Sequence, residues 1–377
     1  MAKLFKFKHV IILVVTSFSL IVVTPCYSES VEYQSVKLSA TSKESFANWG
    51  TDPNTKNGSI ELKDAWRIFT KKKDVVVAVI DTGIDFNHPH LNKNVYVFYN
   101  TPSEQNYGVD FSFQAGASAS AAASANASAS ETKIAESTAA SSYRRTPYDQ
   151  HGHGTHVAGI IKTIFPEVKI LAIKYYNPYA SGVENLNSTI RALKYAVEEA
   201  DVDIINYSGG GPEPSTEELR LLKQAERKGI LVVAAAGNEH SNIDKKENAY
   251  YPASYGLSNI ITVTAHNQNA EILPSSNWGR KSVDISAPGQ NIRSSLPHER
   301  AGMMTGTSQA TAFVTGVAAL IKSQYADLDA KTIKEVIINS AQRVDKMKDK
   351  CVAAGILSAN RALVRAQQGN SKSYAIK

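Results

Sequence analysis

Short apolar runs that alternate with segments of helical periodicity constrain the fold of this chain most strongly. The runs consist mainly of Val, Ile, Leu and Ala and cover residues 75–80, 168–173, 204–205, 230–234 and 260–263. Near-continuous apolar strands are typical of a sheet buried on both faces. Residues 183–199 and 215–228 carry charges at helical spacing, and the second segment opens with Ser215 and precedes Gly229, as a capped helix does. The pattern predicts a three-layer α/β fold, with a mostly parallel central sheet and helices on both faces.

Polar residues stand where such a fold carries function, at the carboxyl ends of its strands. Asp81 ends the first run, which is too apolar to accept an unpaired charge. His153 lies in DQHGHGTHVAG, which opens a helix-like segment, and Ser308 lies in GTSQATA before another apolar run. A serine at a helix N-terminus is well placed for reactions that develop negative charge. Asp, His and Ser together suit acyl transfer, because His removes the serine proton while Asp orients the imidazole.

These motifs resemble those of the subtilisin-like serine proteases, the subtilase family. The resemblance rests on DTGIDFNHPHL, HGTHVAG and GTSQATA, and it extends from about residue 48 to about residue 366 apart from one insertion. It implies a serine endopeptidase that acts through an acyl-enzyme intermediate, with Asp81, His153 and Ser308 as catalytic residues. It further implies polypeptide substrates and chemistry that requires no cofactor.

Two further segments resemble the parts of the family that contact substrate. In AAAGNE, Asn238 stands where the family's asparagine amide helps to bind the oxyanion. The stretch YSGGG resembles the strand edge that pairs with an extended peptide, so Ser208, Gly209 and Gly210 are the expected substrate-binding residues. Many relatives have a leucine at the place of Gly209, so a reduced apolar wall is expected near the scissile bond.

The residues that complete the pocket for the amino acid before the scissile bond are expected at 250–252 and 234–236. Neither segment offers an acidic side chain, so no strict preference for basic residues is expected.

Three histidines within six residues raise a metal site as an alternative. HGHGTH lacks the His-Glu-x-x-His order that places two ligands and a base on one helix face, so the sequence predicts no metal site. The resemblance assigns the base to His153, with His156 packed under the helix and His151 as an exposed neighbour. His90 stands where many relatives have an acidic calcium ligand, which leaves a structural calcium without support. A metal-dependent hydrolase and a catalytically silent binding module are the rival functions.

The first 28 residues are predicted to be a signal peptide. Lys3, Lys6 and Lys8 precede an apolar run that is shorter than the roughly 20 residues of a membrane span. A secreted protein, extracellular or periplasmic and with no membrane anchor after cleavage, is therefore expected; an uncleaved anchor is the alternative. Residues 29–47 are expected to form a short pro-segment or extension, residues 48–367 the peptidase domain and residues 368–377 a polar tail.

Composition indicates a flexible insertion and excludes some classes of partner and cross-link. Residues 115–142 are almost purely small and polar and predict a flexible surface insertion within the peptidase domain. The formal net charge of +6 forms no long basic face, so nucleic-acid binding is not expected. Of the two cysteines, Cys26 lies in the predicted signal peptide and Cys351 is left as a single thiol, so no intramolecular disulfide is expected. We expect a monomer.

Overall fold

A central sheet organises the part of the chain that the computed structural model describes, which comprises residues 36–37, 46–101, 104–113 and 146–374. The predicted signal peptide, the 115–142 insertion and most of the 29–47 segment lie outside these residues. In spatial order the nine strands are β13 (Gln342–Arg343), β14 (Gly355–Ile356), β10 (Ile285–Pro288), β9 (Ile260–His266), β8 (Leu231–Ala235), β7 (Ile204–Tyr207), β2 (Val76–Asp81), β6 (Lys169–Lys174) and β5 (Gly108–Asp110).

All neighbouring strands of this sheet are parallel except β13 and β14, which are antiparallel. The apolar runs of the sequence became β2, β6, β7, β8 and β9, as predicted. The register pairs Ile80 with Tyr207 and Tyr207 with Ala234. The carboxyl ends of β2, β7 and β8 therefore meet at one edge of the sheet.

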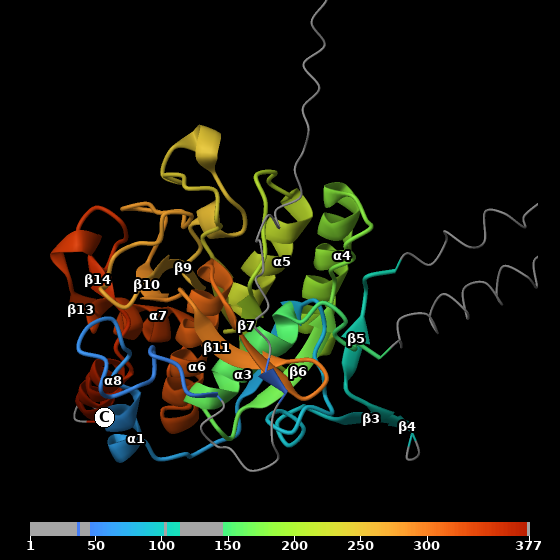
Figure 1. Cartoon of the computed structure of the whole chain (residues 1–377), viewed down its shortest axis with the longest axis horizontal. Coiled ribbons are helices and arrows are strands. Elements are labelled where there is room, and N and C mark those ends of the chain that lie inside the picture. Colours follow the sequence, from blue (N-terminus) through green and yellow to red (C-terminus); the bar gives the residue numbers. More distant parts are fainter. Residues whose placement is uncertain (1–35, 38–45, 102–103, 114–145, 375–377) are drawn as a thin grey trace, which may run out of the picture.

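Helices cover both faces of the sheet, which gives the predicted three layers (Figure 1). One face packs against α1 (Leu62–Ile68), α3 (His153–Ile164), α6 (Thr307–Gln324), α7 (Ala330–Asn339) and α8 (Ala359–Tyr374). The other packs against α4 (Gly182–Lys194), its π-helical continuation η2 (Tyr195–Glu199) and α5 (Thr216–Arg227). Alternation along β2 feeds both cores, because Val77 and Val79 join the first and Ala78 and Ile80 join the second.

Helix ends follow the capping signals of the sequence. The Ser215 side chain accepts a hydrogen bond from the Glu218 N–H at 3.2 Å, and Gly229 adopts a left-handed φ of 75° after α5. Helix α6 is buried almost all round, as a helix at the centre of a core requires. Helix α8 continues to Tyr374, so most of the predicted polar tail is helical.

Smaller elements complete the described chain. Strands β1 (Val36–Lys37), β12 (Arg300–Met304) and β11 (Ile292–Leu296) form an antiparallel sheet, and β3 (Phe98–Thr101) and β4 (Glu104–Asn106) form a hairpin. Three short 3-10 helices lie in the connections: η3 (Lys246–Asn248), η4 (Ala253–Tyr255) and η5 (Asp345–Met347). Strand β11 packs on α3 so closely that a Cβ at Gly159 would lie 2.3 Å from the Ser294 Oγ.

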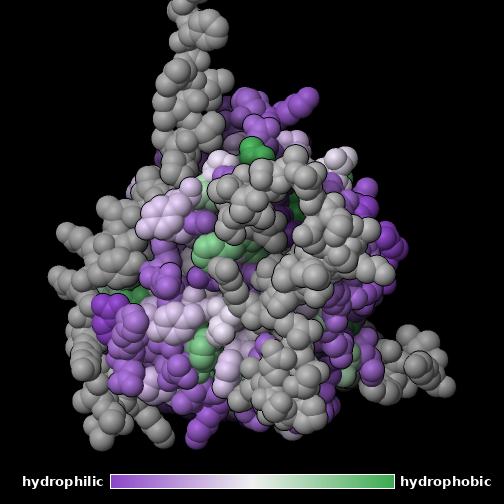
Figure 2. Space-filling view, turned by 90° about the vertical axis from the view of Figure 1, so that its right-hand side faces the viewer, coloured by the Kyte–Doolittle hydropathy of each residue, from purple (hydrophilic) through white to green (hydrophobic). Residues whose placement is uncertain are grey.

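The face of the molecule drawn in Figure 2 is mainly polar. On the face drawn in Figure 2, hydrophilic residues predominate among the coloured atoms and hydrophobic ones form only small separate patches. Within the described ranges, none of the helices combines the length and the apolar character needed to cross a bilayer.

Candidate active site

Asp81 and His153 meet at the carboxyl edge of the sheet, as predicted. Asp81 is the last residue of β2 and His153 the first of α3, and the Asp81 Oδ1 lies 2.7 Å from the His153 Nδ1. Each side chain is only 2 % exposed. Their approach depends on Gly154, because a Cβ there would lie 2.1 Å from the Gly83 carbonyl oxygen. This small residue in the histidine motif lets the first turn of α3 sit against the end of β2.

Ser308 lies at the start of α6, next to the end of β7. It is 5 % exposed, and its hydroxyl donates a hydrogen bond to the Ser208 carbonyl at 3.1 Å. The Ser208 hydroxyl donates in return to the Ser308 carbonyl at 3.3 Å. Asn206 donates to the Ser208 hydroxyl at 2.9 Å and accepts from the Thr315 hydroxyl at 2.8 Å. This buried network joins the predicted substrate strand to the helix that carries the predicted nucleophile.

The side-chain amide of Asn238 has a defined orientation. Its Oδ1 accepts hydrogen bonds from the Thr307 backbone N–H at 3.0 Å and the Thr307 hydroxyl at 3.2 Å. Since the oxygen faces these donors, the NH₂ end of the amide points away from Thr307. The side chain is half-buried and lies beside the residue that precedes Ser308.

Asp149 belongs to the site, a role that the sequence motifs did not predict. Its fully buried carboxylate accepts five hydrogen bonds, from the Thr82 hydroxyl, the His151, Gly152 and Thr155 backbone N–H groups, and the Thr155 hydroxyl. The Thr82 hydroxyl also accepts from the Gly154 N–H at 2.9 Å. Asp149 therefore ties the end of β2 to the first turn of α3. Asp149 lies three residues before Gly152, the N-cap of α3, and an acidic side chain near a helix N-terminus is favoured by the helix dipole, which could have indicated this role.

The other two histidines of the motif do not converge with His153. The His156 Nε2 lies 2.9 Å from the Ile292 carbonyl oxygen and 3.2 Å from that of Gly302, so His156 packs beneath the helix. Complete burial lowers the pKa of His156 to about 3. The His151 ring is centred 6.4 Å from the His153 ring, and it is half-buried instead of exposed as expected. Among the described residues, no three His, Cys, Asp or Glu side chains form a group that could hold a metal ion.

The environment of His90 does not fit a calcium ion. The His90 Nδ1 lies 2.9 Å from the Ser295 hydroxyl, and its ring stacks on Phe46 with 3.9 Å between the centroids. Burial lowers the pKa of His90 to about 3, so the imidazole is neutral. Calcium requires several oxygen ligands, and a stacked imidazole supplies none.

Residues 209–211 form a glycine strip after Ser208, in which Gly209 and Gly210 have less space around them than expected. A Cβ at Gly209 would lie 2.4 Å from the Tyr175 hydroxyl, and one at Gly210 would lie 2.3 Å from the Tyr251 carbonyl oxygen. Tyr175 thus takes the space beside Gly209 that a larger residue would need. The strip continues in a short antiparallel bridge, in which Gly211 and Tyr251 exchange two hydrogen bonds of 3.0 and 2.8 Å.

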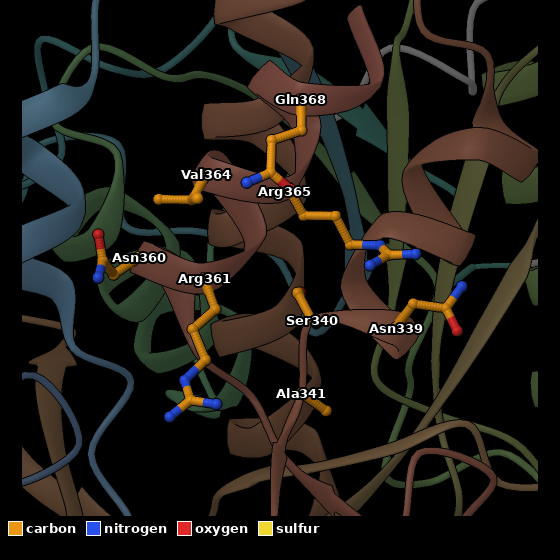
Figure 3. A pocket seen from close by; sticks show the side chains of 8 residues that line it. All are labelled: Asn339, Ser340, Ala341, Asn360, Arg361, Val364, Arg365 and Gln368. Carbon is orange, nitrogen blue, oxygen red and sulfur yellow. The ribbon is translucent and has the colours of Figure 1, made fainter. Parts of the chain in front are cut away.

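A separate pocket lies between the end of α7 and helix α8 (Figure 3). Its lining residues are Asn339, Ser340, Ala341, Asn360, Arg361, Val364, Arg365 and Gln368. None of the predicted site residues belongs to it.

Comparison with known proteins agrees with this geometry. The model of the subtilase family matches residues 72–370. The major intracellular serine protease of Bacillus subtilis (strain 168) is 34 % identical over 273 residues, which cover 70 % of this chain and 73 % of that protein. The minor extracellular protease Epr of the same organism is 28 % identical over 306 residues, which cover 79 % of this chain and 38 % of that protein.

A solved structure supports the fold. It is described as the structural basis of subtilase cytotoxin SubAB assembly, and it superposes with a TM-score of 0.64 at 23 % identity, covering 88 % of this chain and all of the other. The family match and the relatives together show that this chain belongs to the subtilase family and is a subtilisin-like serine endopeptidase.

Proposed function

We propose that Ser308 is the nucleophile that attacks the peptide carbonyl, that His153 takes its proton, and that Asp81 orients His153. The observation that carries this assignment is the buried 2.7 Å contact between the Asp81 Oδ1 and the His153 Nδ1. This contact leaves the His153 Nε2 as the nitrogen that exchanges a proton with the substrate side. His153 then returns the proton to the leaving amine, and water releases the acyl group from Ser308 in a second round of the same steps.

Two donors would bind the oxyanion: the NH₂ of Asn238 and the backbone N–H of Ser308. The Thr307 contacts occupy the Asn238 Oδ1, so the NH₂ of the same amide points away from Thr307 and can donate to another acceptor. The Ser308 N–H belongs to the first turn of α6, where backbone N–H groups have no intrahelical acceptor. Loss of the equivalent asparagine in subtilisin costs about a hundred- to thousand-fold in turnover, and we expect a similar loss for Asn238→Ala.

The peptide substrate would pair with the backbone of Ser208, Gly209 and Gly210. These residues follow β7 directly and continue its backbone beyond the sheet, as a segment that pairs with an extended peptide requires. In the structure the Ser308 hydroxyl donates to the Ser208 carbonyl. The hydroxyl must turn from that carbonyl to His153 before attack. Ser208 would therefore take part both in binding the peptide and in activating the nucleophile.

We further propose that the protein is exported through residues 1–28, acts as a monomer and needs no cofactor for catalysis. Support for export comes from the basic residues before the apolar run and from an extracellular relative; another relative is intracellular. Incubation with a calcium chelator should leave the hydrolysis rate unchanged, because the stacked imidazole of His90 stands where many relatives have an acidic calcium ligand.

A serine-directed fluorophosphonate tests the assignment. Peptide mapping by mass spectrometry should find one adduct, on Ser308, and it should disappear in Ser308→Ala and His153→Ala. Ser188→Ala is the matched control, since Ser188 is a buried helical serine whose hydroxyl donates to the Glu184 carbonyl. The same spectra give the N-terminus of the exported protein, which we expect near Ser28. A folded protein without an adduct on Ser308 would overturn the assignment and favour a catalytically silent binding module.

A further inference from the structure

One aromatic ring lies between the two backbone segments that would flank a scissile bond. Strands β7 and β8 are parallel neighbours, so residues 208–211 and 236–238 leave the sheet side by side. A Cβ at Gly210 would lie 2.5 Å from the Tyr250 Cε1, and one at Gly237 would lie 3.0 Å from the Tyr250 Cε2. Tyr250 is only 6 % exposed, so its ring fills the space between these glycines.

Hydrogen bonds fix the backbone that carries the Tyr250 ring. The Tyr250 N–H donates to the Ser254 hydroxyl at 3.0 Å, and the Ser254 N–H donates to the Tyr250 carbonyl at 2.7 Å. The next residue, Tyr251, is fixed by its two hydrogen bonds with Gly211. The ring also belongs to the larger hydrophobic core. These bonds fix the backbone from which the ring projects, and moving the ring from between the segments would take it out of this core.

The positions of Ser308 and Asn238 indicate which part of a substrate the Tyr250 ring would exclude. Ser308 touches Ser208 at the start of the first segment, and Asn238 ends the second. A carbonyl carbon at the Ser308 hydroxyl, with its oxygen at the Asn238 amide, must lie between these segments. The side chain of the same residue either enters the space between them or stays in solvent. Tyr250 already occupies the space near Gly210 and Gly237.

We infer that Tyr250 is a specificity-determining residue that restricts the residue on the acyl side of the scissile bond to Gly, Ala or Ser. This inference rests on the proposed roles of Ser308 and Asn238. A large side chain such as Phe would have to displace the buried ring or forgo burial, and both cost transition-state stabilisation.

The test uses peptide p-nitroanilides that differ only in the residue before the scissile bond: Gly, Ala, Leu or Phe. For the unmodified protein we expect kcat/KM for Ala to exceed that for Phe by at least about 10-fold. For Tyr250→Ala we expect kcat/KM for Phe to rise by about 30-fold or more, since the opened space can bury an aromatic side chain. Tyr250→Phe keeps the ring and should keep the preference for Ala over Phe.

Tyr325→Ala controls for a general loosening of the core. Tyr325 is 7 % exposed, belongs to the same core and lies at the far end of α6 from Ser308. It should leave the Ala-to-Phe ratio unchanged.

Titration with a small fluorophosphonate separates the catalytic role of Ser308 from the specificity role of Tyr250. Absence of labelling in the folded protein would refute the catalytic assignment itself. If Ser308 is labelled but the unmodified protein hydrolyses the Phe substrate as fast as the Ala substrate, the role of Tyr250 is refuted while the catalytic assignment stands. An unchanged ratio in folded Tyr250→Ala would refute it equally.

Discussion

Replacement of Asp149 by alanine should destabilise the protein and slow the nucleophile together. Its buried carboxylate accepts from three backbone N–H groups and two hydroxyls. The hydroxyls can turn to other acceptors, but the backbone groups cannot. A buried donor without an acceptor costs about 1–3 kcal/mol, so three of them cost about 3–9 kcal/mol, towards the lower end if water enters the space left by the carboxylate. Removal of a buried charge returns part of its desolvation cost, which leaves an expected loss of about 3 kcal/mol in the free energy of unfolding.

The effect on chemistry follows from what Asp149 holds. It joins Thr82, which follows Asp81, to the turn that carries His153. A displacement of about 1 Å between catalytic groups can cost about a hundred-fold in rate. We therefore expect the rate of fluorophosphonate labelling of Ser308 to fall at least about 10-fold in Asp149→Ala, even at temperatures where the variant is fully folded.

Urea unfolding and the labelling rate of the folded variant measure the two effects. Asp110→Ala is the matched control, because Asp110 is also buried and, within the part of the chain that the structure describes, accepts from the Ser112 N–H and hydroxyl alone. It should lose about 1 kcal/mol and retain the labelling rate. A loss below about 1 kcal/mol in Asp149→Ala, with an unchanged labelling rate, would show that the five contacts neither stabilise nor position the site.

Three further predictions concern buried groups. Burial raises the pKa of Cys351 to about 11, so the thiol should resist maleimide at pH 8 in the native protein and react in denaturant; equal rates would contradict its burial. Burial lowers the pKa of His156 to about 3 and that of His266 to about 4, both from 6.5. The unfolded chain therefore binds more protons below pH 6.5, and stability should fall as the pH drops from 6.5 towards 4, by up to about 1.4 kcal/mol per pH unit for each group. Urea unfolding at several pH values should show a smaller slope for His266→Gln, and an unchanged slope would refute this cause. Gly154→Ala should abolish labelling, because its Cβ would lie 2.1 Å from a backbone oxygen, whereas Gly182→Ala, whose Cβ would point into open space, should label normally.

The layered fold was predictable because it depends on local periodicity. The runs that became β2, β6, β7, β8 and β9 are apolar on both faces, and only a sheet covered on both sides suits such strands. The capped helix α5 was equally visible in Ser215 and Gly229. Helix α6 was harder to assign from periodicity alone, since a fully buried helix has no polar stripe.

The site was predictable to the extent that its residues lie in motifs. Asp81 and His153 are in contact as the motifs implied. The five contacts of Asp149 depend on the path of the loop before α3, and local spacing says little about that path. The half-burial of His151 was also not visible from local spacing. It depends on Tyr176, which comes from another part of the chain and whose ring is centred 5.8 Å from that of His151.

The crowding of the glycine strip shows most clearly what local sequence cannot predict. Glycines in YSGGG indicated open space, since glycine has no side chain of its own. Whether that space stays open depends on residues far away in the chain. Tyr175 follows β6 and Tyr250 precedes η4, yet both side chains reach the strip. A glycine therefore signals close approach by another group as readily as it signals room for a substrate.

On the proposed roles of Ser208 and Ser308, their reciprocal hydrogen bonds would connect substrate binding with activation of the nucleophile. The Ser208 carbonyl belongs to the segment that would pair with the peptide, and it also accepts the hydroxyl proton of the proposed nucleophile. While that bond persists, the Ser308 proton is not directed at His153. A peptide backbone that pairs along this segment changes the surroundings of this carbonyl and brings its own carbonyl to Ser308. The hydroxyl is thus expected to turn towards His153 when a substrate is in place, so that its proton is directed at the base only in the substrate complex.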